Sequence, residues 1–169
     1  NNALYAKYRE QADRFGNLHL LGRLAEYKYY NMDAIAARAL ELAEKHGLKT
    51  CALVSNMSIA AERRDMLQRF DCFICNQQEA GLLFLDDYSE KSPEEMQAIL
   101  ADRVVRAKIP SMVVTMGGRG AVYADCKGVS GICPARSVQV VDTTGAGDAF
   151  CAGVSIGLTS NIDTDILST

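Results

Sequence analysis

The chain has 169 residues, a net charge of −3 and 49% hydrophobic residues, a composition that fits one globular domain with a single core. No apolar run is long enough to span a membrane and no export signal is recognisable, so we expect a cytoplasmic protein. The mild acidity and the absence of tryptophan disfavour a nucleic-acid surface, which would carry clustered lysine and arginine.

Helix and strand patterns alternate through the first half of the chain. An apolar stripe predicts a helix over 32–46, and Gly47 follows as a stop signal. Residues 50–54 predict a short buried strand, 60–70 a second helix and 72–75 a second strand. The side chains of the second helix that should face inward are Met66, Leu67 and Phe70.

Two further helices precede the third strand. A short helix is predicted over 77–84, and Ser92 with Glu95 forms a capping box with proline at the first helical position. This helix should run to about residue 107, and a buried strand should follow at 112–115. Its buried side chains are predicted to be Met96, Ile99, Leu100, Val104 and Val105.

The last third of the chain predicts a hairpin and a helix. The glycine-rich segment 117–120 interrupts the strand pattern, which resumes at 121–124 and turns at 125–128. Residues 129–141 predict a strand, a loop and another strand, and a final helix begins near Ala146.

This alternation predicts an α/β fold with a doubly wound, mainly parallel sheet and flanking helices. No internal repeat or linker divides the chain, so we expect a single domain over 1–169. Ligands of such sheets bind beyond the carboxyl ends of the strands. Three polar or glycine-rich segments should meet there: 76–79, 115–120 and 142–148.

Six cysteines allow a metal or redox interpretation, and Cys72 and Cys75 have the spacing of a zinc or dithiol pair. They lie in an apolar, strand-like run rather than at a helix N-terminus, where a redox pair would be activated. Cys126 and Cys133 are too widely spaced to form a second close pair. We therefore favour small buried hydrophobes in a reducing cytoplasm, with zinc or dithiol chemistry as the alternative.

The segment 142–148 is the most informative motif. A glycine turn that opens a helix presents unpaired N–H groups and the positive end of the helix dipole, which together form an anion site. Asp148 in the same turn is a poor anion ligand, but it could accept a proton from an attacking hydroxyl. Such a pair of features suits phosphoryl transfer, although a purely structural strand-to-helix turn explains the spacing equally well.

The sequence of 142–148, Asp-Thr-Thr-Gly-Ala-Gly-Asp, resembles the C-terminal signature of the PfkB-type carbohydrate kinases, the ribokinase family. It is neither a Walker A loop nor a dinucleotide-binding fingerprint. The resemblance implies a ribokinase-like enzyme that transfers the γ-phosphoryl group of ATP to a hydroxyl of a sugar or nucleoside. It assigns Asp148 as the base, and the amides of Gly145, Ala146 and Gly147 as the anion hole.

Asn76 and Glu79 resemble the Asn-x-x-Glu motif of the same family, which implies that they organise Mg²⁺ and phosphate. The chemistry fits, because Mg²⁺ keeps several waters and is held by few carboxylates together with substrate phosphates. Alternatively, Asn76 only caps the following helix and Glu79 is its solvated third residue.

Two weaker likenesses concern the nucleotide. Thr115, Gly117 and Gly120 resemble the Thr-x-Gly-x-x-Gly segment that lies against the nucleotide, although a glycine-rich turn explains them equally well. Arg119 in this turn could contact phosphate, but we expect it to be solvated. Residues 54–56 resemble an Asp-x-Asn element in which valine replaces the aspartate, so only Asn56 receives a phosphate-side role.

The resemblance covers about residues 45–160. Because family members are roughly twice as long, we expect a fragment that lacks the N-terminal acceptor and lid half and the C-terminal helices. The resemblance implies a small-molecule sugar or nucleoside partner and a homodimer. We expect no nucleic acid or membrane partner. In some members of the family a monovalent cation binds near the positions of Asp142 and Thr144. Residues 116–131 also resemble pseudouridine kinases. The alternative function is a non-catalytic nucleotide-binding or regulatory module of the same fold.

Overall fold

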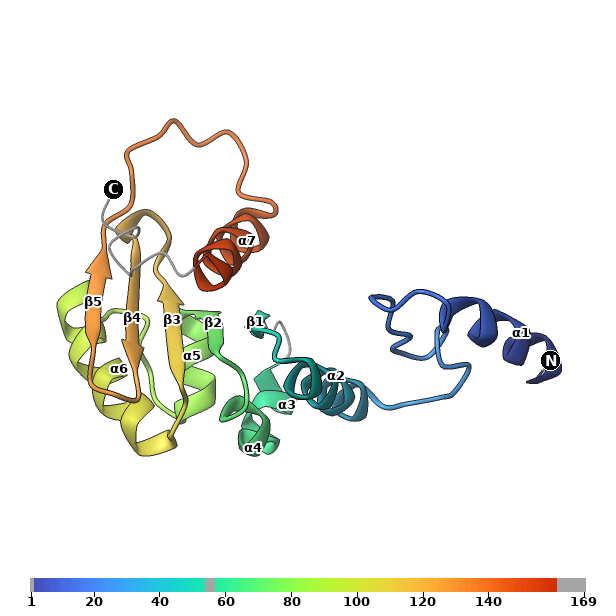
Figure 1. Cartoon of the computed structure of the whole chain (residues 1–169). Coiled ribbons are helices and arrows are strands. Elements are labelled where there is room, and N and C mark those ends of the chain that lie inside the picture. The colour runs from blue at the N-terminus through green and yellow to red at the C-terminus, as the bar shows by residue number, and fades with distance from the viewer. Residues whose placement is uncertain (1, 54–56, 161–169) are drawn as a thin grey trace. The chain divides into compact units, whose positions relative to one another are not determined.

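The computed structural model describes residues 2–53 and 57–160. They fall into two compact units, one up to Gly47 and one from Leu48 onward (Figure 1). That the whole chain is one domain stays a prediction. No helix in the described ranges is both long enough and apolar enough to cross a membrane.

The first unit contains two helices, α1 (Asn2–Ala12) and α2 (Met32–His46). The second confirms the helix predicted from the apolar stripe, and Gly47 ends it in the left-handed conformation with φ 63°. The segment between the helices is joined to α2 by an ion pair of Glu26 with Arg38, and to α1 by a 2.9 Å hydrogen bond from the Tyr5 hydroxyl to the Ala25 carbonyl.

The second unit is built on a five-stranded sheet in the order β1-β2-β3-β4-β5. Strands β1, β2 and β3 pair in parallel, and β4 pairs antiparallel with both β3 and β5, so β4 alone runs in the opposite direction. The mixed, mainly parallel sheet and the inserted hairpin are confirmed. The strands are Cys51–Leu53, Cys72–Asn76, Ser111–Thr115, Ala121–Asp125 and Ser130–Cys133.

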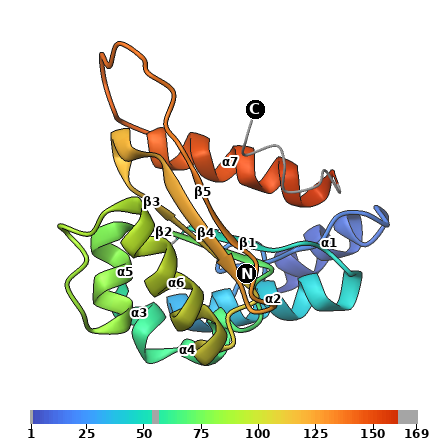
Figure 2. The same cartoon turned by 90° about the vertical axis from the view of Figure 1, so that its left-hand side faces the viewer.

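Helices cover both faces of this sheet, as the prediction of a doubly wound fold requires (Figure 2). Successive residues of a strand point to opposite faces. Phe73 and Cys75 of β2 therefore face the core under the helices α3 to α6, whereas Cys72 and Ile74 face α7. The helices are α3 (Met57–Glu62), α4 (Arg64–Leu67), α5 (Gln77–Phe84), α6 (Pro93–Ala107) and α7 (Ala146–Thr159).

Three details of the sequence-based prediction are wrong. The helix expected over 60–70 is two short helices, α3 and α4. The second strand expected within 129–141 is absent, since residues 134–141 are described without strand pairing. Val105 is 47% exposed, because it lies on the side of α6 away from the buried residues Met96, Leu100 and Val104.

The glycine turn between β3 and β4 contains a close approach of two backbone segments. It includes the short 3₁₀ helix η1 (Gly117–Arg119) and Gly120, whose φ is 94°. A Cβ atom on Gly120 would lie 2.1 Å from the carbonyl oxygen of Cys133 and 2.8 Å from the amide nitrogen of Ala135. Only glycine fits here, because both the space and the backbone conformation exclude a side chain.

We predict that Gly120→Ala lowers the free energy of unfolding by about 2–4 kcal/mol, the sum of backbone strain and overpacking. The matched control is Gly118→Ala in the same turn, where an added Cβ meets nothing within 4 Å, and it should change stability by less than about 0.5 kcal/mol. Urea unfolding followed by circular dichroism measures both. Equal stabilities of the two variants would contradict the close approach.

Candidate functional site

The ends of two parallel strands bring two of the predicted segments together. Asn76 is the last residue of β2, Thr115 is the last residue of β3, and the two are register partners. Because parallel strands end at the same edge of the sheet, residues 39 positions apart become neighbours there. The Thr115 hydroxyl donates to the Cys75 carbonyl oxygen at 3.4 Å, across the same pair of strands.

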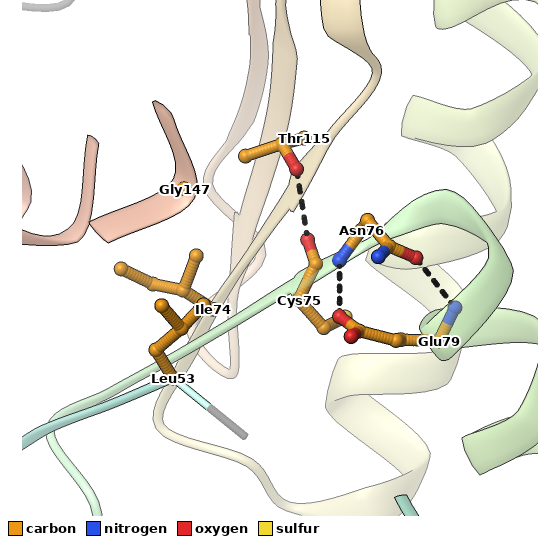
Figure 3. Close-up of a pocket in the computed structure, with 7 residues that line it drawn as sticks. All are labelled: Leu53, Ile74, Cys75, Asn76, Glu79, Thr115 and Gly147. Carbon is orange, nitrogen blue, oxygen red and sulfur yellow. Dashed lines mark hydrogen bonds between the residues drawn. The ribbon is translucent and has the colours of Figure 1, made fainter. Parts of the chain in front are cut away.

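A pocket of about 200 Å³ opens at this edge (Figure 3). Asn76 and Glu79 line it from the start of α5, Thr115 lines it from β3, and Gly147 lines it from the first turn of α7. The structure thus brings together residues from all three segments that the sequence singled out. Its remaining lining residues, which sequence reasoning missed, are Leu53, Ile74 and Cys75.

Asn76 and Glu79 form a capping box at the start of α5. The Asn76 side-chain oxygen accepts from the backbone amide of Glu79 at 2.8 Å, and Glu79 Oε2 accepts from the backbone amide of Asn76 at 2.8 Å (Figure 3). The capping role weighed as an alternative is therefore present. The capping box engages one carboxylate oxygen of Glu79. Glu79 is half-buried and lines the pocket, so the magnesium role stays a prediction.

The N-terminus of α7 has the backbone geometry of an anion site. Gly145 is its N-cap residue with φ 76°, and glycine offers no side-chain oxygen to cap the amides of the first turn. A Cβ on Gly147 would meet nothing within 4 Å, so this turn is open on the pocket side. Ala146 lies between these glycines, and its amide donates to the Thr143 carbonyl at 3.1 Å.

Asp148 follows Gly147 in the first turn of α7 and is exposed. Its carboxylate is therefore reachable from solvent and is not sealed in the packing between helix and sheet. It does not itself line the pocket, which ends at its neighbour Gly147.

The loop before α7 is shaped by an aspartate turn. Asp142 Oδ1 accepts from both the amide and the hydroxyl of Thr144 at 2.8 Å. These hydrogen bonds lower the pKa of Asp142 below its ordinary value, because they stabilise the ionised carboxylate. The turn directs the chain into the left-handed Gly145 and so places the first turn of the helix.

The other residues given a nucleotide role are less close to the pocket. Gly117, with φ 59°, and Gly120 shape the turn between β3 and β4, and neither lines the pocket. Asn56 lies outside the described residues.

Arg119 is exposed, as the sequence predicted for this turn, but its guanidinium is also held by hydrogen bonds. Its guanidinium donates to the Lys91 carbonyl oxygen at 3.0 Å and to the side-chain oxygen of Gln77. Gln77 is buried and in turn donates to the carbonyl oxygens of Tyr88 and Lys91. This network holds the glycine turn against the start of α5. No sequence motif predicts it.

The zinc or dithiol alternative at Cys72 and Cys75 is not supported by the geometry. The two residues are three positions apart in a strand and so point to opposite faces of the sheet. Burial raises the pKa of the Cys75 thiol well above its ordinary value, which suits a buried hydrophobe. Across residues 2–53 and 57–160, no three histidine, cysteine or acidic side chains are grouped to hold a metal ion.

Comparisons with known proteins agree with this geometry. The model of the pfkB family of carbohydrate kinases matches residues 17–165. A guanosine-inosine kinase of Exiguobacterium acetylicum is 35% identical over 126 residues, which cover 74% of this chain and 41% of that protein. A ribokinase of Schizosaccharomyces pombe is 29% identical over 117 residues, which cover 69% and 36%.

The fold is also found among solved structures. The ribokinase of Arabidopsis thaliana, solved with ribose and ATP, has a TM-score of 0.67 and 22% identity, and the match covers 80% of this chain and 42% of that chain. This likeness shows a ribokinase-like fold. The chain spans less than half the length of the curated relatives that it matches.

We predict that Arg119→Ala lowers the free energy of unfolding by about 1–3 kcal/mol, because it leaves the buried side-chain oxygen of Gln77 without its donor. Arg106→Ala is the matched control: Arg106 forms an exposed pair with Asp102 at 2.7 Å, and its loss should cost less than about 1 kcal/mol. Thermal unfolding of both variants measures the difference. Losses of the same size would show that the Arg119 network contributes nothing beyond a surface contact.

Proposed function

The chain belongs to the pfkB family of carbohydrate kinases, and from this premise we propose that it carries the phosphate-binding and proton-accepting residues of a kinase. The enzyme transfers the γ-phosphoryl group of ATP to a hydroxyl of a sugar or nucleoside. The observation that supports this most directly is the first turn of α7, which lines the pocket with Gly147 and carries the exposed Asp148 as its next residue.

The first turn of α7 acts as the anion hole. Backbone amides of Gly145 and Gly147, together with the positive end of the helix dipole, face the charge that develops on the transferred phosphoryl group. The Ala146 amide, which donates to the Thr143 carbonyl oxygen in this structure, joins them only if it exchanges that acceptor for the phosphate. These donors are held in place by the helix before the reaction begins. They therefore need little rearrangement as the charge develops, which is the property that makes such donors effective.

Asp148 accepts the proton of the acceptor hydroxyl. As the proton passes to the carboxylate, the hydroxyl oxygen bonds to the γ-phosphorus, and the bond from that phosphorus to the bridging oxygen of ATP breaks. The position of Asp148 one residue after the anion hole suits this role, because base and phosphoryl group must lie on either side of the attacking oxygen.

Asn76 and Glu79 serve the cation that accompanies the nucleotide. Their amide and carboxylate oxygens are hard ligands of the kind that Mg²⁺ takes, directly or through water. Bound there, Mg²⁺ would neutralise charge on the phosphates. Thr115 contributes a hydroxyl at the same strand edge, and the glycine turn after it provides bare backbone for the nucleotide.

The acceptor is a sugar or nucleoside. The relatives include a guanosine-inosine kinase and a ribokinase. The substrates in these names all contain ribose, either as a free sugar or as part of a nucleoside. Guanosine, inosine, pseudouridine and ribose are therefore the first acceptors to test.

We predict that Asp148→Asn lowers kcat by about 10²–10⁴-fold, because asparagine keeps the shape of the side chain but cannot accept the proton. Nucleotide binding should change little. Asp102→Asn on α6 is the control and should leave kcat unchanged. Transfer of ³²P from ATP to the four acceptors measures the rate, and calorimetry with Mg-ATP measures binding.

Undiminished transfer by Asp148→Asn would remove the base from the proposal. Tight Mg-ATP binding by the unaltered protein, with no phosphorylation of any sugar or nucleoside tested, would instead favour a non-catalytic nucleotide-binding or regulatory module.

We predict that Glu79→Gln raises the Mg²⁺ concentration needed for half-maximal activity by about tenfold or more, because a neutral amide replaces a carboxylate ligand. Glutamine still completes a capping box, so α5 should remain folded. The matched control is Glu95→Gln, since Glu95 holds the same place in the Ser92 capping box of α6. Activity is titrated with Mg²⁺ for both variants. If both variants need the same Mg²⁺ concentration for half-maximal activity, Glu79 serves only as a helix cap.

A further inference from the structure

Three thiols meet between the sheet and α7, on the face opposite Cys75. Cys51 of β1 and Cys72 of β2 are register partners in the parallel pair. Cys151 of α7 lies over them, with its sulfur 3.9 Å from that of Cys51. All three are free thiols, and Cys51 and Cys151 are partly exposed whereas Cys72 is buried. No short sequence pattern indicates this group, because Cys51 and Cys151 are 100 positions apart.

The surroundings of Cys51 make it the nucleophile of the group. A hydrogen bond from the Cys72 thiol, with smaller contributions from Ser155 and Cys151, lowers the pKa of Cys51 to about 6 against the opposing effect of burial. The reactive form of cysteine is the thiolate, and the lowered pKa favours this form of Cys51. The same interaction and burial raise the pKa of Cys72, so Cys72 stays protonated as the donor.

We propose that Cys51 and Cys151 form a site of reversible oxidation, in which a hydroperoxide oxidises Cys51 and Cys151 then closes a disulfide between β1 and α7. The sulfurs are 3.9 Å apart and must approach by about 1.9 Å to reach the S–S bond length of about 2.05 Å. This shift is within reach of one side chain and one helix end.

The chemistry balances in two steps. The Cys51 thiolate attacks one oxygen of the hydroperoxide, an S–O bond forms as the O–O bond breaks, and an alcohol or water leaves after taking up a proton. The Cys151 sulfur then attacks the sulfenic acid, the S–S bond forms, the S–O bond breaks and water leaves. The negative charge of Cys51 is one of the causes that raise the pKa of Cys151. Because the first step removes this charge, it favours deprotonation of Cys151 for the second step.

The position of Cys151 connects this site to the pocket. Cys151 lies one helical turn after Asp148 and Gly147, on the side of α7 that packs against the sheet. A disulfide that draws Cys151 towards β1 shifts or tilts the first turn of the helix. If the proposed kinase function holds, on which this consequence rests, oxidation displaces the anion hole and the base together and lowers phosphoryl transfer.

The test is a titration of the protein with hydrogen peroxide at pH 7, followed by alkylation, digestion without reductant and mass spectrometry. We expect a peptide linked through Cys51 and Cys151, and oxidation of Cys51 about tenfold faster than that of the exposed Cys126, because the pKa of Cys51 is lowered. In Cys151→Ser, Cys51 should stop at the sulfenic acid and be trapped by dimedone. Cys126→Ser is the control and should form the disulfide normally.

Three outcomes would overturn the proposal: a disulfide between Cys51 and Cys72, oxidation of Cys126 before Cys51, or unmodified Cys51 at peroxide concentrations that oxidise Cys126. These outcomes do not depend on kinase activity. If the linked peptide forms but the reduced protein phosphorylates no acceptor, the proposed function fails and the oxidation site stands.

The pH profile gives an independent readout. The groups that act on Cys51 are Cys72 from β2 and both Cys151 and Ser155 from α7. The ion pair of Lys49 with Asp71, at 2.9 Å, lies just before the two strands. Because the pKa of Cys51 is lowered to about 6, its oxidation rate should rise through pH 6 and level off by pH 7. A rate that keeps rising to about pH 8.5, as for an ordinary thiol, would refute an activated Cys51.

In the active protein, the disulfide should lower the transfer rate by about tenfold or more, and dithiothreitol should restore it. Cys151→Ser treated in the same way should lose this reversible response while keeping its activity before oxidation. An oxidised protein that contains the disulfide and works at full rate would separate the oxidation site from control of the kinase.

Discussion

The parallel register of β2 against β3 is the constraint on which the site depends. It aligns Asn76 with Thr115 at one end of the sheet, and the direction of both strands decides that the polar segments following them emerge on the same edge. A slip of one residue would turn every side chain of the strand to the opposite face. It would then turn the fully buried Phe73 and Cys75 towards α7, and Cys72 and Ile74 towards the larger core under α3 to α6. The core therefore fixes the position of the pocket.

The other half of the site depends on how α7 is attached. Its buried side is formed by Phe150, Cys151, Val154 and Leu158, which pack on the sheet around Ile74 and Val113. These residues are partly buried and extend along the helix from the end of its first turn to its last turn. The polar first turn is consequently free of packing and available to a ligand, while its direction is set by the aspartate turn that precedes it.

The fold was largely predictable because its signals are local. The apolar stripe of α2, the capping box of α6 and the glycine before α7 each specify an element within a few residues. The motif residues Asn76, Glu79, Thr115 and Gly147 converge because strand order follows chain order. The bracing of Arg119 on Gln77 and the group of Cys51, Cys72 and Cys151 could not be predicted in this way. They depend on which side chains of distant segments face one another, and no short pattern encodes that.

The link from Arg119 to Gln77 joins two parts of the ligand environment that the chain encodes far apart. Gln77 follows Asn76 directly, and Arg119 precedes Gly120 in the turn after Thr115. These hydrogen bonds thus hold the two sides of the strand edge together before any ligand arrives. A molecule that binds across them has little conformational entropy left to remove, so more of its contact free energy is expressed as affinity.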